Sequence, residues 1–314
     1  MSAPSILQPI NHPTFAKHNV QVMIKRDDKL DNIISGNKWR KLKYNLQDIK
    51  ATGKKGIITF GGCFSNHIHA TAFACYQQKL PAIAIIRGEA SNQNNYTLAW
   101  AKHWGMKLIF VDRKTYRLRD DEIYLQHLQQ QYPDYAIVPE GGSNTLALTG
   151  VAEVIDELNQ QATFDTLMTP VGSGGTLAGL IVGDKEQHKL LGVSVLKQET
   201  YLENQIRNLL PEHAKAYSNW VLLNEYHCGG YAKFSQDDTN KIREFSIDTG
   251  IDFEPVYSGK MLLALLNLVE TGYFPAQHRI VLLHTGGLQG LAGMFERGIL
   301  NADEWPSLPV PPVR

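Results

Sequence analysis

Cysteine is scarce in this chain, and an excess of charge of one sign is absent. Three cysteines, Cys63, Cys75 and Cys228, occur among 314 residues; their odd number and the lack of a CxxC spacing exclude a disulfide framework and a thiolate zinc site. The 31 basic and 31 acidic side chains balance, which argues against a nucleic-acid or polybasic membrane surface. We therefore expect no nucleic acid, membrane or metal among its ligands.

The chain also lacks segments that would direct it to or across a membrane. No apolar run approaches the ~18 residues that a membrane-spanning helix needs. The opening residues, MSAPSILQPINHP, have neither the basic start nor the long apolar core of a secretory signal. The sequence therefore predicts a cytoplasmic protein.

Short β-branched runs alternate with longer segments of helical period, which is typical of an α/β fold. Three runs, Ile57–Phe60, Ala82–Ile86 and Lys107–Val111, begin 25 residues apart, and the gaps hold helix candidates at Ala70–Gln78 and Asn94–Trp104. Further strands are expected at Val20–Lys25, Ala136–Val138, Thr166–Pro170, Leu190–Val195 and Arg279–Leu283. The length exceeds the roughly 250 to 300 residues that one hydrophobic core supports, so we expect two domains.

A Gly-rich turn follows the strand candidate Thr166–Pro170 and leads into helical sequence. The segment from Thr169 reads TPVGSGGTLAGL, whose small residues allow consecutive backbone N–H groups to face an anion at the start of a helix. It is not a dinucleotide fingerprint, because Leu177 stands where the third glycine would be. We expect a phosphate site here; the alternative is a tight strand-to-helix turn without a ligand.

A basic segment beginning at Ser35 reads SGNKWRKL and opens a helix that is predicted to end near Lys50. At 100° per residue, Trp39, Leu42, Leu46 and Ile49 form one apolar stripe, with Lys38 at its edge in the first turn. Partial burial and the positive end of the helix both lower the pKa of an amine toward the neutral form that a Schiff base requires. Lys38 is therefore a candidate nucleophile; the alternative is one more solvated cation in a run of four.

The segment GGCFSNHIHATA, residues 61 to 72, follows the first of the regularly spaced strands. Ser65 or Asn66 is a candidate N-cap, and with the first amides of the helix this pair can hold a carboxylate. His67 and His69 would fall about 200° apart on a helix, so we expect structural roles for them and no shared metal ion. Cys63 has no Cys/His signature around it and is expected to be a small buried hydrophobe.

Two tyrosines and a threonine stand beside glycines further along the chain. Tyr231 ends a GGY triplet, Tyr257 lies in EPVYSGK, and Thr285 lies in HTGG after the last predicted strand. Each tyrosine alone is more typical of a packed aromatic side chain. Gly-rich turns that follow parallel strands meet at the carboxyl edge of a sheet, so the joint occurrence of these motifs indicates one crevice.

In chain order, GNKWRKL, GGCFSNHIHATA, PEGGSN, VGSGGTLAGL, GGY, EPVYSGK and HTGG resemble the 1-aminocyclopropane-1-carboxylate deaminase/D-cysteine desulfhydrase family over residues 20 to 290. The resemblance implies a fold-type II enzyme of pyridoxal 5′-phosphate, similar to the tryptophan synthase β subunit, with two open twisted α/β domains. It implies that a small domain, residues 46–149, is inserted into a large cofactor-binding domain of residues 1–45 and 150–314. It further implies a small amino-acid substrate and a homodimer.

The resemblance also implies roles for individual residues. Lys38 would bind the cofactor as a Schiff base, Asn66 would bond its 3′-oxygen, and Thr285 would approach the pyridine nitrogen. Ser65, Asn66 and His67 would bind the substrate, while Tyr231 and Tyr257 would flank the reacting carbons and share the catalytic work with Lys38. The phosphate would be held by the loop residues Gly172, Ser173, Gly174, Gly175 and Thr176.

The implied activity is a β-elimination like that of D-cysteine desulfhydrase, which converts D-cysteine to pyruvate, sulfide and ammonia. The family's deaminases have Glu after the tyrosine of VYxGK, where this chain has Ser258, whereas Thr285 is desulfhydrase-like. Phe64 departs from both the deaminases and the desulfhydrases of the family, because Gln is expected at this position beside the Ser-Asn pair. The alternatives are a 1-aminocyclopropane-1-carboxylate deaminase and, in another class, a pyridoxal-phosphate-binding protein without turnover.

Overall fold

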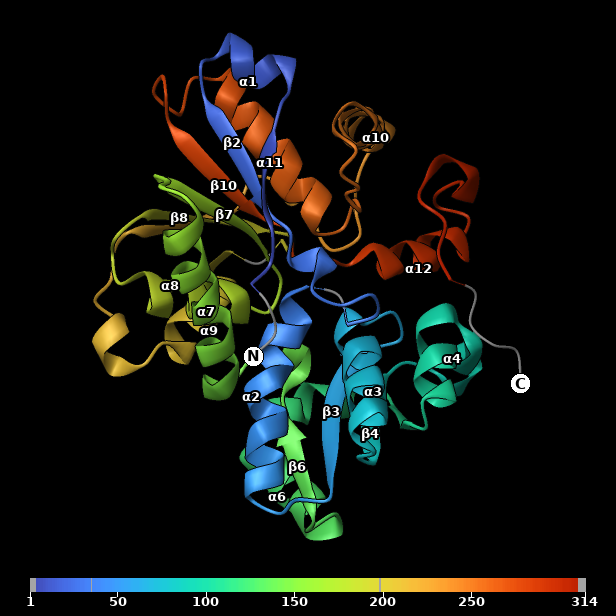
Figure 1. Ribbon diagram of the computed structural model, residues 1–314. Helices are drawn as coiled ribbons and strands as arrows, with labels where there is room; N and C mark the ends of the chain where they lie inside the picture. Colours follow the sequence, from blue (N-terminus) through green and yellow to red (C-terminus); the bar gives the residue numbers. More distant parts are fainter. Residues whose placement is uncertain (1–3, 35, 198, 310–314) are drawn as a thin grey trace.

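Two separate β-sheets organise the molecule, as the computed structural model shows for residues 4–34, 36–197 and 199–309 (Figure 1). The larger sheet has the strand order β1-β2-β10-β7-β8-β9 and the smaller one β5-β4-β3-β6. In the described chain β1 and β2 pair antiparallel, and the other strand pairs are parallel. The larger sheet comprises β1 Leu7–Ile10, β2 Gln21–Lys25, β10 Arg279–Leu283, β7 Thr166–Val171, β8 Lys189–Ser194 and β9 Trp220–Leu223. The smaller sheet comprises β5 Lys107–Val111, β4 Ala82–Arg87, β3 Gly56–Gly62 and β6 Tyr135–Val138.

The predicted strands are all confirmed, with ends that differ by no more than one or two residues from those expected. The three regularly spaced runs are β3, β4 and β5, which lie side by side in the smaller sheet. The sequence analysis missed β1 and β9, which are the two edges of the larger sheet. Both are only four residues long, and β1 contains Pro9, which strands tolerate at a sheet edge.

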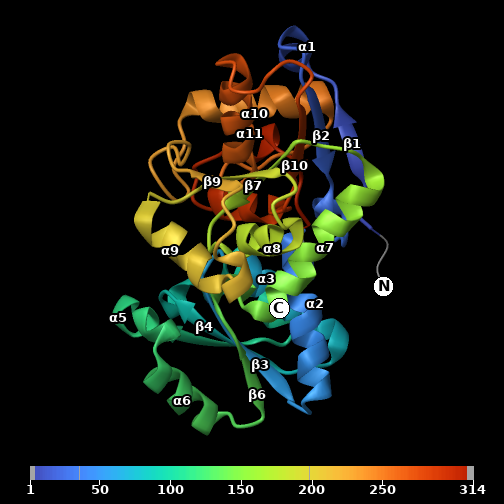
Figure 2. The ribbon, with the colours of Figure 1, turned by 90° about the vertical axis from the view of Figure 1, so that its left-hand side faces the viewer.

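Helices cover both faces of each sheet, so each half of the molecule is an α/β layer structure (Figure 2). On the larger sheet, α10 and α11 pack on one face and α7, α8 and α9 on the other. On the smaller sheet, α2, α3 and α4 pack on one face and α5 and α6 on the other. None of the helices in the described ranges is long and apolar enough to cross a bilayer. Their bounds are α1 Pro13–Lys17, α2 Asn37–Ala51, α3 Asn66–Gln78, α4 Tyr96–His103, α5 Arg113–Tyr116, α6 Glu122–Gln131, α7 Thr145–Gln161, α8 Gly175–Asp184, α9 Glu199–Leu209, α10 Gln236–Thr249, α11 Ser258–Glu270 and α12 Ala292–Phe295.

The helix pair α2 and α7 connects the two halves. A Cβ at Gly150 of α7 would overlap the carbonyl of Arg40 in α2, so glycine is what allows the two helices to approach. The Arg40 guanidinium is 3% exposed and donates to both carboxylate oxygens of Asp27 and of Glu157. Lys25 of β2 also pairs with Glu157, at 2.6 Å. This buried ionic network holds α2, and therefore Lys38, against the larger sheet.

Candidate active site

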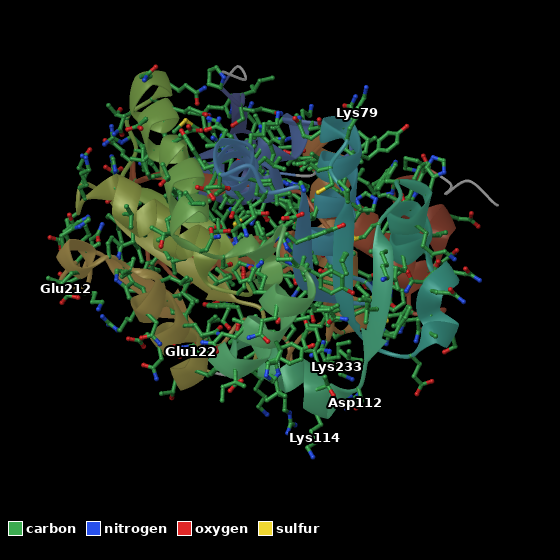
Figure 3. The ribbon with its side chains drawn as sticks, turned by 90° about the horizontal axis from the view of Figure 1, so that it is seen from below. Lys79, Asp112, Lys114, Glu122, Glu212 and Lys233 are labelled. Atoms are coloured by element: carbon green, nitrogen blue, oxygen red, sulfur yellow. The ribbon has the colours of Figure 1, made fainter. Side chains whose placement is uncertain are left out.

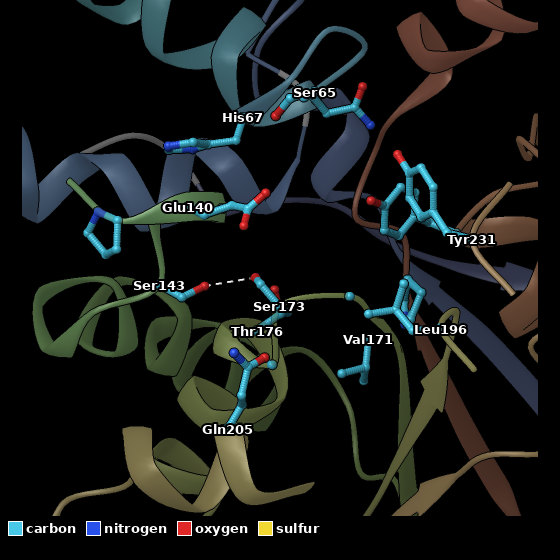
Figure 4. A pocket seen from close by; sticks show the side chains of 18 of the residues that line it. Ser65, His67, Glu140, Ser143, Val171, Ser173, Thr176, Leu196, Gln205 and Tyr231 are labelled. Atoms are coloured by element: carbon cyan, nitrogen blue, oxygen red, sulfur yellow. Dashed lines mark hydrogen bonds between the residues drawn. The ribbon is translucent and has the colours of Figure 1, made fainter. Parts of the chain in front are cut away.

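A cleft of about 1800 Å³ lies between the two halves, lined by the residues that follow β3, β4, β6, β7 and β10. These strands are parallel within each sheet, so the turns at their carboxyl ends gather at one edge, as expected for an α/β binding crevice. Figure 4 shows side chains from both halves pointing into this space. Of the predicted site residues, all but Gly175 line the cleft, and Gly175 is the first residue of α8 behind the loop.

Lys38 enters the cleft from the first turn of α2, as predicted. A Cβ at Gly36 would overlap the carbonyl of Thr285, and Gly36 has φ +57°, so only glycine allows α2 to begin against the turn after β10. The Lys38 side chain is partly buried, and no acceptor contacts its amine among the described residues. Burial lowers the pKa of Lys38 to about 8, because the charged amine loses water without gaining a carboxylate. At pH 7.4 an amine with this pKa is neutral in roughly one molecule in five, compared with about one in a thousand for an ordinary lysine.

Lys41, one turn further along α2, is a second amine in the cleft that sequence reasoning missed. It is 1% exposed and donates to the carbonyl of Gly141 at 3.2 Å and to Ser143 Oγ at 3.1 Å. Burial and the charge of Lys38 lower its pKa well below the usual value. The signal in the sequence was the i, i+3 spacing from Lys38, which places both side chains on one helix face.

The predicted phosphate loop, residues 172–176, lies opposite Lys41 between β7 and α8. Gly174 is the N-cap of α8 with φ +79°, a left-handed conformation that favours glycine. Ser173 Oγ lies 2.8 Å from Ser143 Oγ, drawn as a dashed line in Figure 4, and Thr176 Oγ1 accepts from the Asn37 side chain at 2.7 Å. The first amides of α8 have no partner within the helix, so they are available to an anion.

The start of α3 forms another wall, where Ser65 is the N-cap and accepts from the Ile68 N–H at 3.3 Å. The His67 ring is engaged internally, with Nε2 2.7 Å from Thr59 Oγ1 and Nδ1 3.5 Å from Thr71 Oγ1. Because Thr59 donates its own proton to Val138, His67 Nε2 is the donor in that bond. Burial, with the charges of Lys38 and Lys41, lowers the pKa of His67, so the ring is neutral. Any contact of His67 with a substrate therefore comes from its backbone N–H in the first turn of α3.

Tyr231 and Tyr257 both line the cleft, and their rings contact each other edge-to-face with centroids 5.9 Å apart. Burial raises the pKa of the Tyr257 phenol well above its usual value, and the contact with Tyr231 adds to that rise. Tyr231 itself is 47% exposed. The buried Lys260, which sequence reasoning also missed, donates to the carbonyls of His227 and Gly230 at 2.8 and 2.7 Å and fastens the Tyr231 loop to α11.

Thr285 and Ser258, the two candidate partners for the pyridine nitrogen of the cofactor, lie in different surroundings. Thr285 lines the cleft after β10, and Asn66 lies beside the same turn, with Nδ2 3.3 Å from the Cβ position of Gly287. Ser258 is fully buried at the start of α11, where its Oγ accepts from the Glu254 N–H at 3.0 Å and lies 3.2 Å from the Glu254 carboxylate. Ser258 is not among the residues that line the cleft.

Three further side chains before and within α3 are Cys63, Phe64 and His69, and not all of them lie as expected. Phe64 lines the cleft and packs against α12, where a Cβ at Gly293 would lie within 3.0 Å of the Phe64 ring. Cys63 is only partly buried and lines the cleft, so the expectation of a buried side chain was wrong. His69 packs edge-on against Trp104 at 4.9 Å, a structural role as predicted. The described ranges hold no cluster of His, Cys, Asp and Glu that fits a metal ion.

The residues present fit pyridoxal phosphate. Lys41 is a buried amine beside a second amine, its partners are one carbonyl and one hydroxyl, and no carboxylate balances it among the described residues. A phosphate between Lys41, Ser143 and the 172–176 loop would supply the missing negative charge. Lys38 then faces the same space with a reactive amine.

Comparisons with known proteins agree with this fit. Residues 7–286 match the family model described as "Pyridoxal-phosphate dependent enzyme". A Thermotoga maritima protein named putative 1-aminocyclopropane-1-carboxylate deaminase is 31% identical over 298 residues, which cover 90% of this chain and 93% of its own length. The D-cysteine desulfhydrase of Klebsiella pneumoniae is 28% identical over 312 residues, covering 93% of this chain and 94% of its own.

Structural similarity extends over nearly the whole chain. The solved structure described as an ACC deaminase homologue superposes with a TM-score of 0.80 at 27% identity and covers 95% of this chain and 94% of its own. The fold-type II architecture, the cofactor and the family resemblance that the motifs indicated are therefore confirmed. With the paired lysines and the Gly-rich loop in one cleft, this chain belongs to the family of pyridoxal-phosphate dependent enzymes.

Proposed function

We propose that this enzyme catalyses a β-elimination of the D-cysteine desulfhydrase type, in which a β-substituted amino acid yields pyruvate, ammonia and the released substituent. The observation that carries the proposal is the Lys38 amine, which has a lowered pKa and no acceptor, in one cleft with the start of α3 and two phenols. An amine with a pKa of about 8 can act as a base at neutral pH.

The roles of the chain's own residues follow from their surroundings. The cofactor, when bound, supplies the electron sink that makes the α-proton of an amino acid acidic. Lys38 takes that proton, and the backbone N–H groups of Asn66 and His67, with the Ser65 side chain, bind the α-carboxylate at the positive end of α3. Tyr231 and Tyr257, whose phenols line the cleft and contact each other, are the groups that can give a proton to the departing substituent.

The different surroundings of Thr285 and Ser258 favour the desulfhydrase-like branch. A threonine hydroxyl in the cleft wall supports a neutral hydrogen bond to the cofactor's pyridine nitrogen. Ser258 is bonded into the core, and no carboxylate stands at its position to protonate the ring. A cofactor held in this way would supply a weaker electron sink, which favours substrates with a good leaving group.

The test is to incubate the pure, cofactor-loaded protein with D-cysteine, L-cysteine and 1-aminocyclopropane-1-carboxylate, and to assay sulfide, ammonia and keto acid. Sulfide with pyruvate supports the proposal. Keto acid from the cyclopropane substrate alone supports the deaminase alternative, for which the similarity to deaminase-named relatives is the specific observation. Bound cofactor without any product supports a binding protein without turnover.

We propose further that residues 46–149 form the small domain and that residues 1–45 and 150–314 form the large one. The separate four-stranded sheet supports this division. The chain passes between the two proposed domains twice, within the packed helices α2 and α7. A cytoplasmic homodimer is also proposed, on the family resemblance and on three free cysteines in the described chain. Size-exclusion chromatography with light scattering tests the dimer.

A further inference from the structure

Cations dominate the wall of the cleft, although the whole chain has equal numbers of acidic and basic residues. Lys38 and Lys41 are accounted for by the cofactor. Beyond them the cleft is lined by two carboxylates, Asp120 and Glu140, and by six cations, Arg87, Arg113, Arg117, Arg119, Lys197 and Arg297. An amino-acid substrate brings one α-carboxylate, which the start of α3 binds in the proposed function. The remaining positive charge calls for a second anionic group.

Arg87 is the cation of this set that lies beside the reacting region. It is the last residue of β4, its Nη2 is 3.6 Å from the Cβ position of Gly62, and it is close enough to Tyr231 for its charge to oppose the rise of the Tyr231 pKa that burial causes. The guanidinium contacts the Tyr116 ring, 5.4 Å from its centroid. Arg87 is exposed and lines the cleft, and among the described residues its guanidinium has no carboxylate or carbonyl partner, so its N–H donors are available to a ligand.

The nearby carboxylate of Glu140 is committed to other partners. Arg119 Nε lies 2.6 Å from Glu140 Oε2, and the Tyr116 hydroxyl donates to Glu140 Oε1 at 2.7 Å. Arg119 also contacts the Tyr116 ring, 5.3 Å from its centroid. Glu140 therefore neutralises Arg119, while Arg87, which contacts the same Tyr116 ring, has no such partner among the described residues and keeps its charge available to a ligand. In Figure 4, Glu140 and Tyr231 flank the open space from opposite sides.

We propose that Arg87 binds an anionic substituent on the β-carbon of the substrate, so that the preferred substrates are amino acids with a β-sulfonate or β-phosphate group. The inference rests on the proposed function, because it uses the same α-carboxylate site and the same reacting carbons. The planar guanidinium matches the oxygens of both groups with two parallel hydrogen bonds. A neutral thiol offers no such partner.

The reaction balances without an oxidant or reductant. Lys38 removes the α-proton, the bond from Cβ to sulfur or to the ester oxygen breaks, and its electron pair leaves with sulfite or with phosphate. The released enamine takes up one water and yields pyruvate and ammonia. Arg87 holds the departing anion as its charge increases.

The kinetic test uses both enantiomers of cysteate and of O-phosphoserine against both enantiomers of cysteine, with the cofactor-loaded enzyme. Pyruvate reports turnover, while sulfite and phosphate assays distinguish the two leaving groups. We expect kcat/KM for an anionic substrate to exceed that for cysteine by about tenfold or more, as a charge-assisted bidentate contact allows. Faster turnover of cysteine than of both anionic substrates would overturn the proposal.

A binding test does not depend on turnover. The probe is 3-sulfopropanoate, which has a carboxylate and a sulfonate but no amine, compared with butanoate by calorimetry. We expect 3-sulfopropanoate to bind about tenfold more tightly, Arg87→Gln to abolish the difference, and Arg87→Lys to restore part of it. Lys114→Gln is the control, because this exposed lysine lies outside the cleft lining and projects from the body of the protein (Figure 3). A difference that persists in Arg87→Gln assigns the anion to other residues and contradicts the proposal.

Failure of this inference differs from failure of the proposed function. Turnover of cysteine together with equal binding of the two probes would leave β-elimination intact and remove the anion site. Tight binding of 3-sulfopropanoate through Arg87, with no keto acid from any amino acid, would support the anion site and contradict β-elimination.

Discussion

Lys38 and Lys41 stand one helical turn apart on α2 and meet different surroundings. Lys38 has no acceptor among the described residues, whereas Lys41 donates to Gly141 and Ser143 beside the Gly-rich loop. We expect borohydride reduction of the cofactor-loaded protein, followed by peptide mapping, to label Lys38. Lys38→Ala should lose the label and at least about 100-fold of kcat, the usual contribution of a positioned base. Lys41→Met should keep the label on Lys38 but bind the cofactor about tenfold more weakly, because the phosphate loses a charged partner.

Lys43→Met is the matched control for these variants, since Lys43 pairs with Glu153 and does not line the cleft. A label on Lys41 in the unmodified protein would reverse the two assignments.

Glu254 is a buried carboxylate with an unusual proton affinity. Its oxygens accept from the N–H groups of Val256, Tyr257 and Ser258, yet burial outweighs these bonds and raises the pKa of Glu254 to about 7. The folded state therefore holds a proton that the unfolded chain releases near pH 4.5. As pH rises from about 4.5 to 7, the free energy of unfolding should fall by roughly 3 kcal/mol on account of this group and then level off.

Urea unfolding across pH, with Glu254→Gln as the variant, measures this effect. Glutamine does not titrate. Between pH 4.5 and pH 7.5 the free energy of unfolding of the unmodified protein should therefore fall by roughly 3 kcal/mol relative to that of the variant. Two parallel pH profiles would show that the carboxyl group has an ordinary pKa in the folded protein.

At the scale of single elements, the position of α2 depends on the buried network around Arg40. Asp27 is fully buried, and its carboxylate has Arg40 as its charged partner at 2.6 Å. Arg40→Met should lower the free energy of unfolding by about 3 to 5 kcal/mol, because it leaves buried carboxylates without a counter-charge. Lys55→Met is the control: it breaks an exposed pair with Asp134 and should leave the free energy of unfolding nearly unchanged. Similar losses in both variants would contradict a structural role for the network.

The loop that carries Tyr231 depends on one buried lysine of α11. Lys260 is fully buried and bonds carbonyls on both sides of Gly229. We expect Lys260→Met to lower kcat by about 10- to 100-fold through misplacement of Tyr231, with little change in cofactor affinity. The double variant Lys260→Met/Tyr231→Phe should be no worse than the more damaging single variant, because both act through the same phenol. Additive losses would mean that Lys260 serves the site in some other way.

At the scale of the whole molecule, the cleft is larger than its ligands require. Its volume of about 1800 Å³ exceeds the roughly 300 to 1000 Å³ of a typical small-molecule site. The chain passes between the halves within the helices α2 and α7, and we expect the smaller sheet to move toward the larger one as a unit when a ligand fills the cleft. We expect the radius of gyration from small-angle scattering to fall when 3-sulfopropanoate is added to cofactor-loaded protein. Cofactor-loaded protein without the probe is the control, and an unchanged radius would contradict closure.

Much of the fold was predictable because the relevant interactions are local. Buried parallel strands are short apolar runs, and the 25-residue spacing of three of them indicated strands joined by helices, as β3, β4 and β5 are. The edge strands β1 and β9 were missed because short edge strands carry little pattern of their own. Ser65 as an N-cap, and the turn at Gly174, could be recognised for the same local reason: residue type and the backbone conformation it favours coincide there.

The sequence by itself determined the central strands of both sheets, the Gly-rich turns, the candidate lysine and, through the order of its motifs, the family. Only the tertiary structure decided which polar side chains are buried and with what. The partners of Lys41 lie about 100 residues away along the chain, and Arg40 meets Glu157 at a separation of 117. In the sequence, a run of four cations is typical of a solvated surface. In the fold, Lys38 is a reactive amine, Lys41 is a candidate partner for an anion, and Arg40 belongs to a buried ionic network. The physical reason is that burial and charge pairing depend on neighbours in space, which local residue preferences do not encode.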